Sequence, residues 1–115
     1  MEAQMKVVFV NSDRIGDGDE ALGTKLMRSF LYSLARTEAK PGAVLFMNSG
    51  VKLTCEGSGA LADIKLLALD GVAIKSCGTC LDYYGITDAL AVGEVGNMNG
   101  TAETLMAAAD VVSVG

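Results

Sequence analysis

Short apolar runs alternate with amphipathic segments along the chain, and this alternation limits the possible folds more than any other feature of the sequence. The runs, most of them rich in β-branched residues, lie at 5–10, 43–47, 72–76, 93–96 and 110–114. The segments between them are long enough for right-handed crossovers between parallel strands. The sequence therefore predicts an α/β fold with a parallel sheet and helices on both of its faces.

The first helix is expected to follow a polar loop. Asp17 can cap it, with Glu20 three positions later in the capping-box place. The helix should end by about Lys40, because Pro41 disfavours α geometry in the residue before it. Its inward-facing residues are predicted from their helical spacing: Leu22, Leu26, Met27, Phe30, Leu31 and Leu34.

Two further helices are expected, one beginning at Ser58 and ending at Gly71, the other over 101–109. Glycine is a good residue with which to end a helix, because it adopts the left-handed conformation without strain. The inward residues of the second helix are predicted to be Leu61, Ile64, Leu67 and Ala68. The segment 51–59, which precedes it, is predicted to be a polar, glycine-rich loop.

The size of the chain fits one domain spanning residues 1–115, with half of its residues hydrophobic. No apolar run approaches the roughly 18 residues that a membrane span needs, and the first residues do not resemble a signal peptide. A cytoplasmic location is expected, in which cysteines stay mostly reduced.

Composition excludes several classes of function. The chain has 9 Lys and Arg against 14 Asp and Glu, a net charge of −5, and no basic stripe of the kind that binds nucleic acid. Aromatic residues make up 5% and Trp is absent, which argues against a surface for stacking bases. There is no histidine, so a Cys–His dyad is impossible and the commonest metal ligand is missing.

The candidate for chemistry is Cys77-Gly78-Thr79-Cys80, which directly follows the third apolar run. The pattern indicates a strand, a tight turn and the start of a helix. Unpaired N–H groups at such a turn carry partial positive charge, so a thiol placed there should ionise more readily than free cysteine, whose pKa is about 8.5. Cys77 and Cys80 are therefore the predicted reactive residues.

Three loops leave the carboxyl ends of the predicted strands, at 11–19, 48–59 and 77–80. Ligands in open α/β sheets bind at this edge, and all three loops are rich in small or polar residues. The residues expected to line a pocket beside the two reactive cysteines are Asn11, Ser12, Asn48, Ser49, Gly50, Cys55, Gly78 and Thr79.

The residues leave four uses of the C-x-x-C pair open. It could be a redox dithiol, or two ligands of a zinc site completed by Cys55 and Asp82, although one such pair without histidine is poor evidence for metal. Cys77 could accept sulfane sulfur as a persulfide that Cys80 resolves. The pair could also simply pack under a turn. Cys55 is most simply an incidental cysteine, since the neighbouring Glu56 would raise its pKa.

Three segments resemble one known family. Residues 44–54, 76–85 and 92–98 look like the DsrE-like domain of YedF-type proteins, which are associated with selenium metabolism. The resemblance covers nearly the whole chain. It implies the DsrE/DsrF-like fold, a three-layer α/β/α sandwich with a parallel five-stranded sheet. YedF-type proteins usually carry a TusA-like domain before the DsrE-like part, and the matching residues here belong to the DsrE-like part.

The resemblance also implies a function. DsrE-like relatives relay persulfide sulfur on a cysteine at the end of the third strand, within homo- or hetero-oligomers, and Cys77 falls at that place. The expected function is therefore a sulfurtransferase-like carrier of sulfur or selenium, with a TusA-like or other sulfur-relay protein as partner, a homo-oligomeric state, and no cofactor or metal. The alternative is a non-catalytic redox-sensing or partner-binding module that uses a Cys77–Cys80 disulfide.

Overall fold

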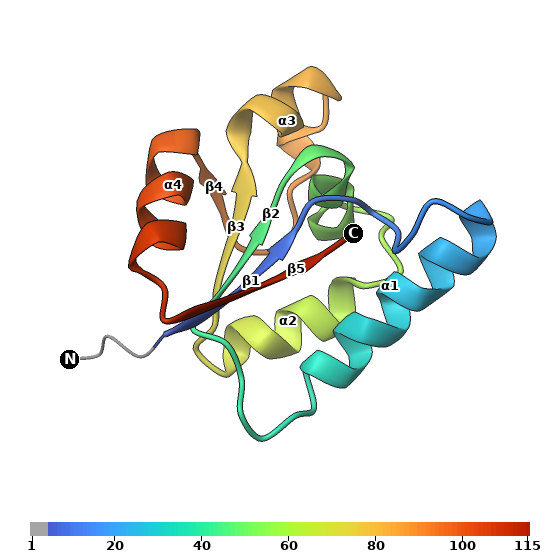
Figure 1. The fold of residues 1–115 in the computed structure, drawn as a ribbon. Helices are drawn as coiled ribbons and strands as arrows, with labels where there is room; N and C mark the ends of the chain where they lie inside the picture. The colour runs from blue at the N-terminus through green and yellow to red at the C-terminus, as the bar shows by residue number, and fades with distance from the viewer. Residues whose placement is uncertain (1–4) are drawn as a thin grey trace.

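The computed structural model describes residues 5–115, in which short strands and helices alternate (Figure 1). The strands are β1 (Lys6–Val10), β2 (Ala43–Phe46), β3 (Ala73–Cys77), β4 (Glu94–Gly96) and β5 (Asp110–Val114). The α-helices are α1 (Glu20–Leu34), α2 (Leu61–Leu69), α3 (Gly78–Tyr83) and α4 (Met98–Ala107), and the 3₁₀ helices are η1 (Asn48–Thr54) and η2 (Thr87–Ala89). All five predicted strands are present, each within one residue of its predicted bounds.

The strands form one parallel sheet in the order β4-β3-β2-β1-β5. In this register Val10 lies beside Phe46, and Phe46 beside Ser76. The carboxyl ends of the three inner strands therefore meet at one edge of the sheet, where the predicted loops emerge. This confirms the predicted α/β fold with a parallel five-stranded sheet.

Helices cover both faces of the sheet, which makes the three layers that the sequence predicts (Figure 1). Helices α1 and α2 lie on one face and α4 on the other, while the short α3 stands at the carboxyl edge. The main core lies under α1 and α2 and includes Val10, Met27, Leu31, Phe46, Ile64 and Leu67. A smaller core under α4 joins Val7, Ala43 and Leu45 to Leu105 and Ala108.

Helix α1 differs from its predicted cap and end. Asp19, not Asp17, is the N-cap, and its carboxylate accepts the N–H of Leu22 at 2.9 Å. The helix ends at Leu34 rather than near Lys40. The Thr37 hydroxyl donates to the Leu34 carbonyl at 3.0 Å. This side chain thus satisfies the carbonyl that a backbone N–H would bond if the helix continued.

The buried side of α1 is also rotated from the prediction. Met27 and Leu31 are fully buried, whereas Leu22 and Leu26 are exposed. Gly23 is the third buried residue of the helix. A Cβ at Gly23 would lie 2.9 Å from the carbonyl oxygen of Ile15, so only glycine lets the preceding loop approach this closely and fix the rotation.

The segment after β2 is not the predicted loop. Four of the seven residues of η1 are buried: Gly50, Val51, Leu53 and Thr54. Helix α2 begins three residues later than predicted, and its Ile64 and Leu67 are buried as expected. Gly71 follows α2 with a φ of 90°, which confirms it as the helix stop. Helix α4 spans Met98–Ala107, earlier than predicted, because Asn97 caps it by accepting the Gly100 N–H at 2.8 Å.

No helix within residues 5–115 has both the length and the apolar character needed to cross a lipid bilayer.

Candidate functional site

Cys77 is the last residue of β3 and lies directly before α3. Its side chain is 4% exposed and belongs to the main core, together with Leu81 and partly buried Cys80. Cys77 therefore lies at the end of the third strand, where the sequence predicts it. The thiol itself is sheltered from solvent and from any large partner.

Cys80 lies one helical turn further, in α3, and its side chain is only partly buried. It opens on a cavity of about 470 Å³ lined by Asn48, Thr79, Cys80, Tyr83 and Tyr84. Its Sγ also accepts the backbone N–H of Asn48 at 3.1 Å. Of the two thiols in the C-x-x-C motif, Cys80 is thus the one that an external molecule can reach.

The pKa of Cys80 is raised above its ordinary value, mainly because partial burial disfavours the thiolate. The N–H of Asn48 opposes this by stabilising negative charge on sulfur, while the hydrogen bond and charge of Cys77 add to the rise. The easier ionisation predicted from a helix start is therefore wrong for Cys80. The N–H group that contacts the Cys80 sulfur belongs to Asn48 in η1. It does not come from the start of α3, which has only six residues.

Asn48 is held in the geometry that directs its N–H at Cys80. Its φ of 54° lies in the left-handed region, which Asn tolerates better than most residues. Its side-chain oxygen accepts the hydroxyl of Tyr84 at 3.0 Å, and the Lys52 ammonium lies 4.4 Å from the centre of the Tyr84 ring. Asn48 and Thr79 are the predicted pocket residues that line this cavity.

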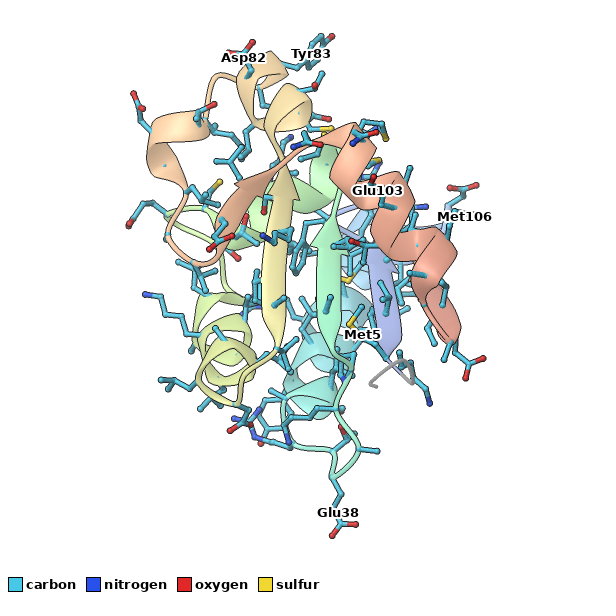
Figure 2. The ribbon with its side chains drawn as sticks, turned by 90° about the vertical axis from the view of Figure 1, so that its left-hand side faces the viewer. Met5, Glu38, Asp82, Tyr83, Glu103 and Met106 are labelled. Carbon is cyan, nitrogen blue, oxygen red and sulfur yellow. The ribbon has the colours of Figure 1, made fainter. Side chains whose placement is uncertain are left out.

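Tyr83 and Tyr84 also line the cavity; from the sequence they could line a pocket or an oligomer face, or pack in the core. The two rings meet edge to face, with centroids 5.5 Å apart. Tyr83 and Asp82 project from α3 at the end of the molecule opposite Glu38 (Figure 2). Their adjacency to the C-x-x-C motif was the only sequence signal for this role.

A buried hydroxyl pair fixes η1 to β3 beside Cys77. The Thr54 hydroxyl donates to the Val51 carbonyl at 2.8 Å, and it lies 2.7 Å from the Ser76 hydroxyl. Because the Thr54 proton is engaged with Val51, Ser76 is the donor within the pair. Both side chains are fully buried. This contact holds the segment that carries Asn48 against the strand that carries Cys77.

Cys55 lies away from the cavity beside Cys80. It follows η1, is 3% exposed, and its thiol donates to the Val51 carbonyl at 3.4 Å. Burial raises its pKa; a hydrogen bond with Thr54 lowers it and the charge of Glu56 raises it further. The structure therefore places Cys55 in the core.

The remaining predicted pocket residues lie at the same edge of the sheet but mainly connect loops. Ser49 accepts the backbone N–H of Asp13 at 3.0 Å, which ties η1 to the loop after β1. Ser12 accepts the N–H of Arg14 at 3.1 Å, and the N–H of Asn11 donates to the carbonyl of Val114 at 3.1 Å.

The two predicted glycines mark close contacts. A Cβ at Gly50 would lie 2.5 Å from the carbonyl oxygen of Val10, and one at Gly78 would lie 2.9 Å from the Val95 side chain. Gly50 thus packs η1 against the end of β1, and Gly78 packs the C-x-x-C turn against β4.

Within residues 5–115, no three Cys, Asp or Glu side chains come close enough together to bind one metal ion. The four ligands considered from the sequence, Cys55, Cys77, Cys80 and Asp82, are accordingly not gathered at one point. All three cysteines are free thiols. What the site offers chemically is a pair of thiols, one sheltered and one open.

No protein-family model matches the chain. No curated protein matches it significantly either.

Solved structures do match it. The YchN protein of E. coli superposes with a TM-score of 0.73 at 20% identity, over 96% of this chain and 98% of that one. MTH1491 from Methanobacterium thermoautotrophicum, of unknown function, gives 0.66 at 21%, over 96% and 99%. BT1422 from Bacteroides thetaiotaomicron, a conserved protein of unknown function, gives 0.66 at 15%, over 99% and 98%. This chain therefore shares the fold of these three proteins, a parallel five-stranded sheet covered by helices.

Proposed function

We propose that this chain is a cytoplasmic sulfur-relay protein of the YedF-type DsrE-like group, which accepts sulfane sulfur, or selenium in the same oxidation state, on its C-x-x-C pair. The observation that carries the proposal is the thiol of Cys80. It opens on a cavity at the carboxyl edge of a parallel sheet and accepts a backbone N–H from Asn48. A second thiol, Cys77, lies one turn before it.

The reaction requires one nucleophile. A thiolate of the pair attacks the outer sulfur of a donor persulfide, the sulfur–sulfur bond of the donor breaks, and the donor leaves as a thiolate. The N–H of Asn48 stabilises the negative charge that the attacking sulfur carries before the new bond forms. Because burial raises the pKa of Cys80, this amide offsets part of the cost of ionisation.

A protein donor fits this site better than a free small molecule. The cavity is bordered by Tyr83, which is 85% exposed, and the adjacent β4 presents the exposed side chain of Val95 against Gly78. Large exposed apolar side chains around a reactive group are typical of a surface that docks a partner. We propose a TusA-like carrier as that partner, and a homo-oligomer as the working state.

Mass spectrometry after incubation with a cysteine desulfurase and cysteine tests the proposal. The wild-type chain and the Cys55→Ser control should react equally well with the transferred sulfur, because Cys55 lies in the core. The Cys77→Ser/Cys80→Ser double variant should take up none. A failure of every variant to react, with the desulfurase shown to be active, would overturn the proposal.

A reversible disulfide sensor is the second candidate, and the proximity of the two thiols favours it. Cys77 directly precedes α3 and Cys80 is its third residue, and Cys80 packs against the core cluster that contains Cys77. The test is the reduction potential of the pair. A value near the cytosolic poise supports a sensor, whereas one of roughly −300 mV or lower indicates a stable structural disulfide.

A further inference from the structure

The two thiols of the C-x-x-C pair differ in access, and this difference has a chemical consequence. Cys77 is 4% exposed and packed in the core, whereas Cys80 lies on a cavity large enough to hold an additional sulfur atom. A protein donor can bring its persulfide to Cys80 but not to Cys77. The sequence suggested the reverse order, with Cys77 accepting sulfur and Cys80 resolving it.

The spacing of the two residues permits a bond between them. Cys77 precedes the first residue of α3 and Cys80 is its third residue, so they are three positions apart on one helical turn. Residues at this spacing have Cβ atoms roughly 5 to 6 Å apart, slightly beyond the 3.5 to 4.5 Å range of a disulfide. Cys77 lies just outside the helix, in extended backbone with a ψ of 123°, so its side chain is not fixed at the helical spacing, and a bond to Cys80 needs a change of conformation at this junction.

We propose that Cys80 is the residue that receives the sulfur and that Cys77 then expels it as sulfide, so that the site discharges its cargo by an internal dithiol reaction. The inference rests on the proposed function. It adds an activity to it: the chain also converts the sulfane sulfur that it accepts, or selenium by the same chemistry, into sulfide or selenide.

The step balances without a metal or cofactor. The Cys77 thiolate attacks the Sγ of the Cys80 persulfide, the bond to the outer sulfur breaks, and that sulfur leaves with the electron pair as hydrogen sulfide. The sulfane sulfur is reduced by two electrons, and the two thiols are oxidised to the Cys77–Cys80 disulfide. A cellular thiol then attacks the exposed Cys80 side of the disulfide and, with a second thiol equivalent, restores both cysteines.

The geometry favours discharge over storage. The outer sulfur of a Cys80 persulfide would lie in the open cavity, from which sulfide can leave directly to solvent. The nucleophile for the second step lies three positions before Cys80, in the core cluster against which Cys80 packs. A persulfide on Cys80 would therefore be short-lived in the wild-type chain and long-lived once Cys77 is removed.

Four proteins test this: the wild-type chain, Cys77→Ser, Cys80→Ser and the Cys55→Ser control. Each is reduced, freed of reductant, and given one equivalent of sulfane sulfur as glutathione persulfide, which leaves as glutathione and releases no sulfide when its outer sulfur is transferred, and sulfide release and intact mass are followed together. The wild-type chain and Cys55→Ser should release stoichiometric sulfide and lose the mass of two hydrogens. Cys77→Ser should retain one added sulfur and release at least tenfold less sulfide, and Cys80→Ser should take up no sulfur.

The outcomes separate the two proposals. Sulfide release by Cys77→Ser at the wild-type rate, or a stable adduct on the wild-type chain, would overturn the discharge step and leave the relay function in place. Uptake by Cys80→Ser with the adduct on Cys77 would overturn the order of the two residues. The absence of an adduct, a disulfide and sulfide in all four proteins would overturn both proposals. Circular dichroism of each variant shows whether it is folded.

Discussion

Two loops leave neighbouring strands at the carboxyl edge of the sheet, and they behave differently. Both are polar and contain glycine in the sequence, at 11–18 after β1 and at 48–54 after β2. The first stays irregular, and its side chains bond locally, as Ser12 does with Arg14. The second becomes η1, buries four of its seven residues, and supplies the amide that contacts Cys80.

The difference shows what makes a loop part of a site. Val51 and Leu53 give η1 apolar side chains to bury, whereas the first loop begins with polar Asn11, Ser12 and Asp13. Once η1 is anchored, its backbone cannot move away from the cysteines, so Asn48 becomes a fixed donor. The Asp13–Ser49 hydrogen bond ties the first loop to η1, and neither partner in this bond lines the cavity beside Cys80.

The largest effect is expected from Gly50→Ala. The new Cβ would lie 2.5 Å from the Val10 carbonyl oxygen, which is backbone and cannot rotate away, so η1 must separate from β1. We expect the free energy of unfolding to fall by about 3 kcal/mol, at the upper end for overpacking. Urea unfolding measures it. Gly18→Ala in the first loop is the matched control, since no atom lies within 4 Å of its added Cβ; an equal loss in both variants would refute the contrast.

Thr54→Val should have a smaller effect. Valine keeps the shape of the side chain but removes the hydroxyl that accepts the Ser76 proton in the core. Leaving a buried donor unpaired costs about 2 kcal/mol. Adding Ser76→Ala should recover part of this loss, because the orphaned hydroxyl is then gone. Ser12→Ala, the counterpart in the first loop, should change stability by less than Thr54→Val, and a larger change would contradict the assignment of the anchor to η1.

Tyr84→Phe should cost less again, about 0.5 to 1 kcal/mol, because it removes one partly exposed hydrogen bond to Asn48. Thermal or urea unfolding measures the change. Tyr83→Phe is the control: its ring projects into solvent (Figure 2), and its hydroxyl should contribute little. Indistinguishable stabilities for Tyr84→Phe and wild type would mean that Asn48 is held by its backbone alone.

The smallest effect on stability should come from pH. The pKa values of Cys80 and Cys55 are both raised in the folded chain, so the protonated thiols contribute stability below the unfolded value of about 8.5, which is lost as pH rises through the folded values. We expect stability to decline above about pH 8.5, and Cys80→Ser and Cys55→Ser each to flatten the decline. Urea unfolding at several pH values checks this; a rise in wild-type stability over the same range would reverse the sign.

The strands and the class of fold could be predicted because each depends on a local pattern. A run such as Val7-Val8-Phe9-Val10 forms a strand that is largely buried, with only Phe9 partly exposed, and Gly71 ends a helix because of its own conformational freedom. The helix faces could not be predicted as well. Leu22 and Leu26 match helical spacing yet are exposed, because the contact between Gly23 and Ile15, which sequence spacing does not reveal, sets the rotation of α1.

The sequence by itself determined that two thiols follow the third strand of a parallel sheet, since strand order along the chain and the C-x-x-C spacing are written in the residues. Only the tertiary structure decided which thiol faces outward. Burial of Cys77 depends on the core around β3, and the donor to Cys80 comes from Asn48, thirty-two positions earlier in the chain. Packing between distant segments sets the access and ionisation of a side chain, and for that reason the roles of the two cysteines could not be read from their spacing.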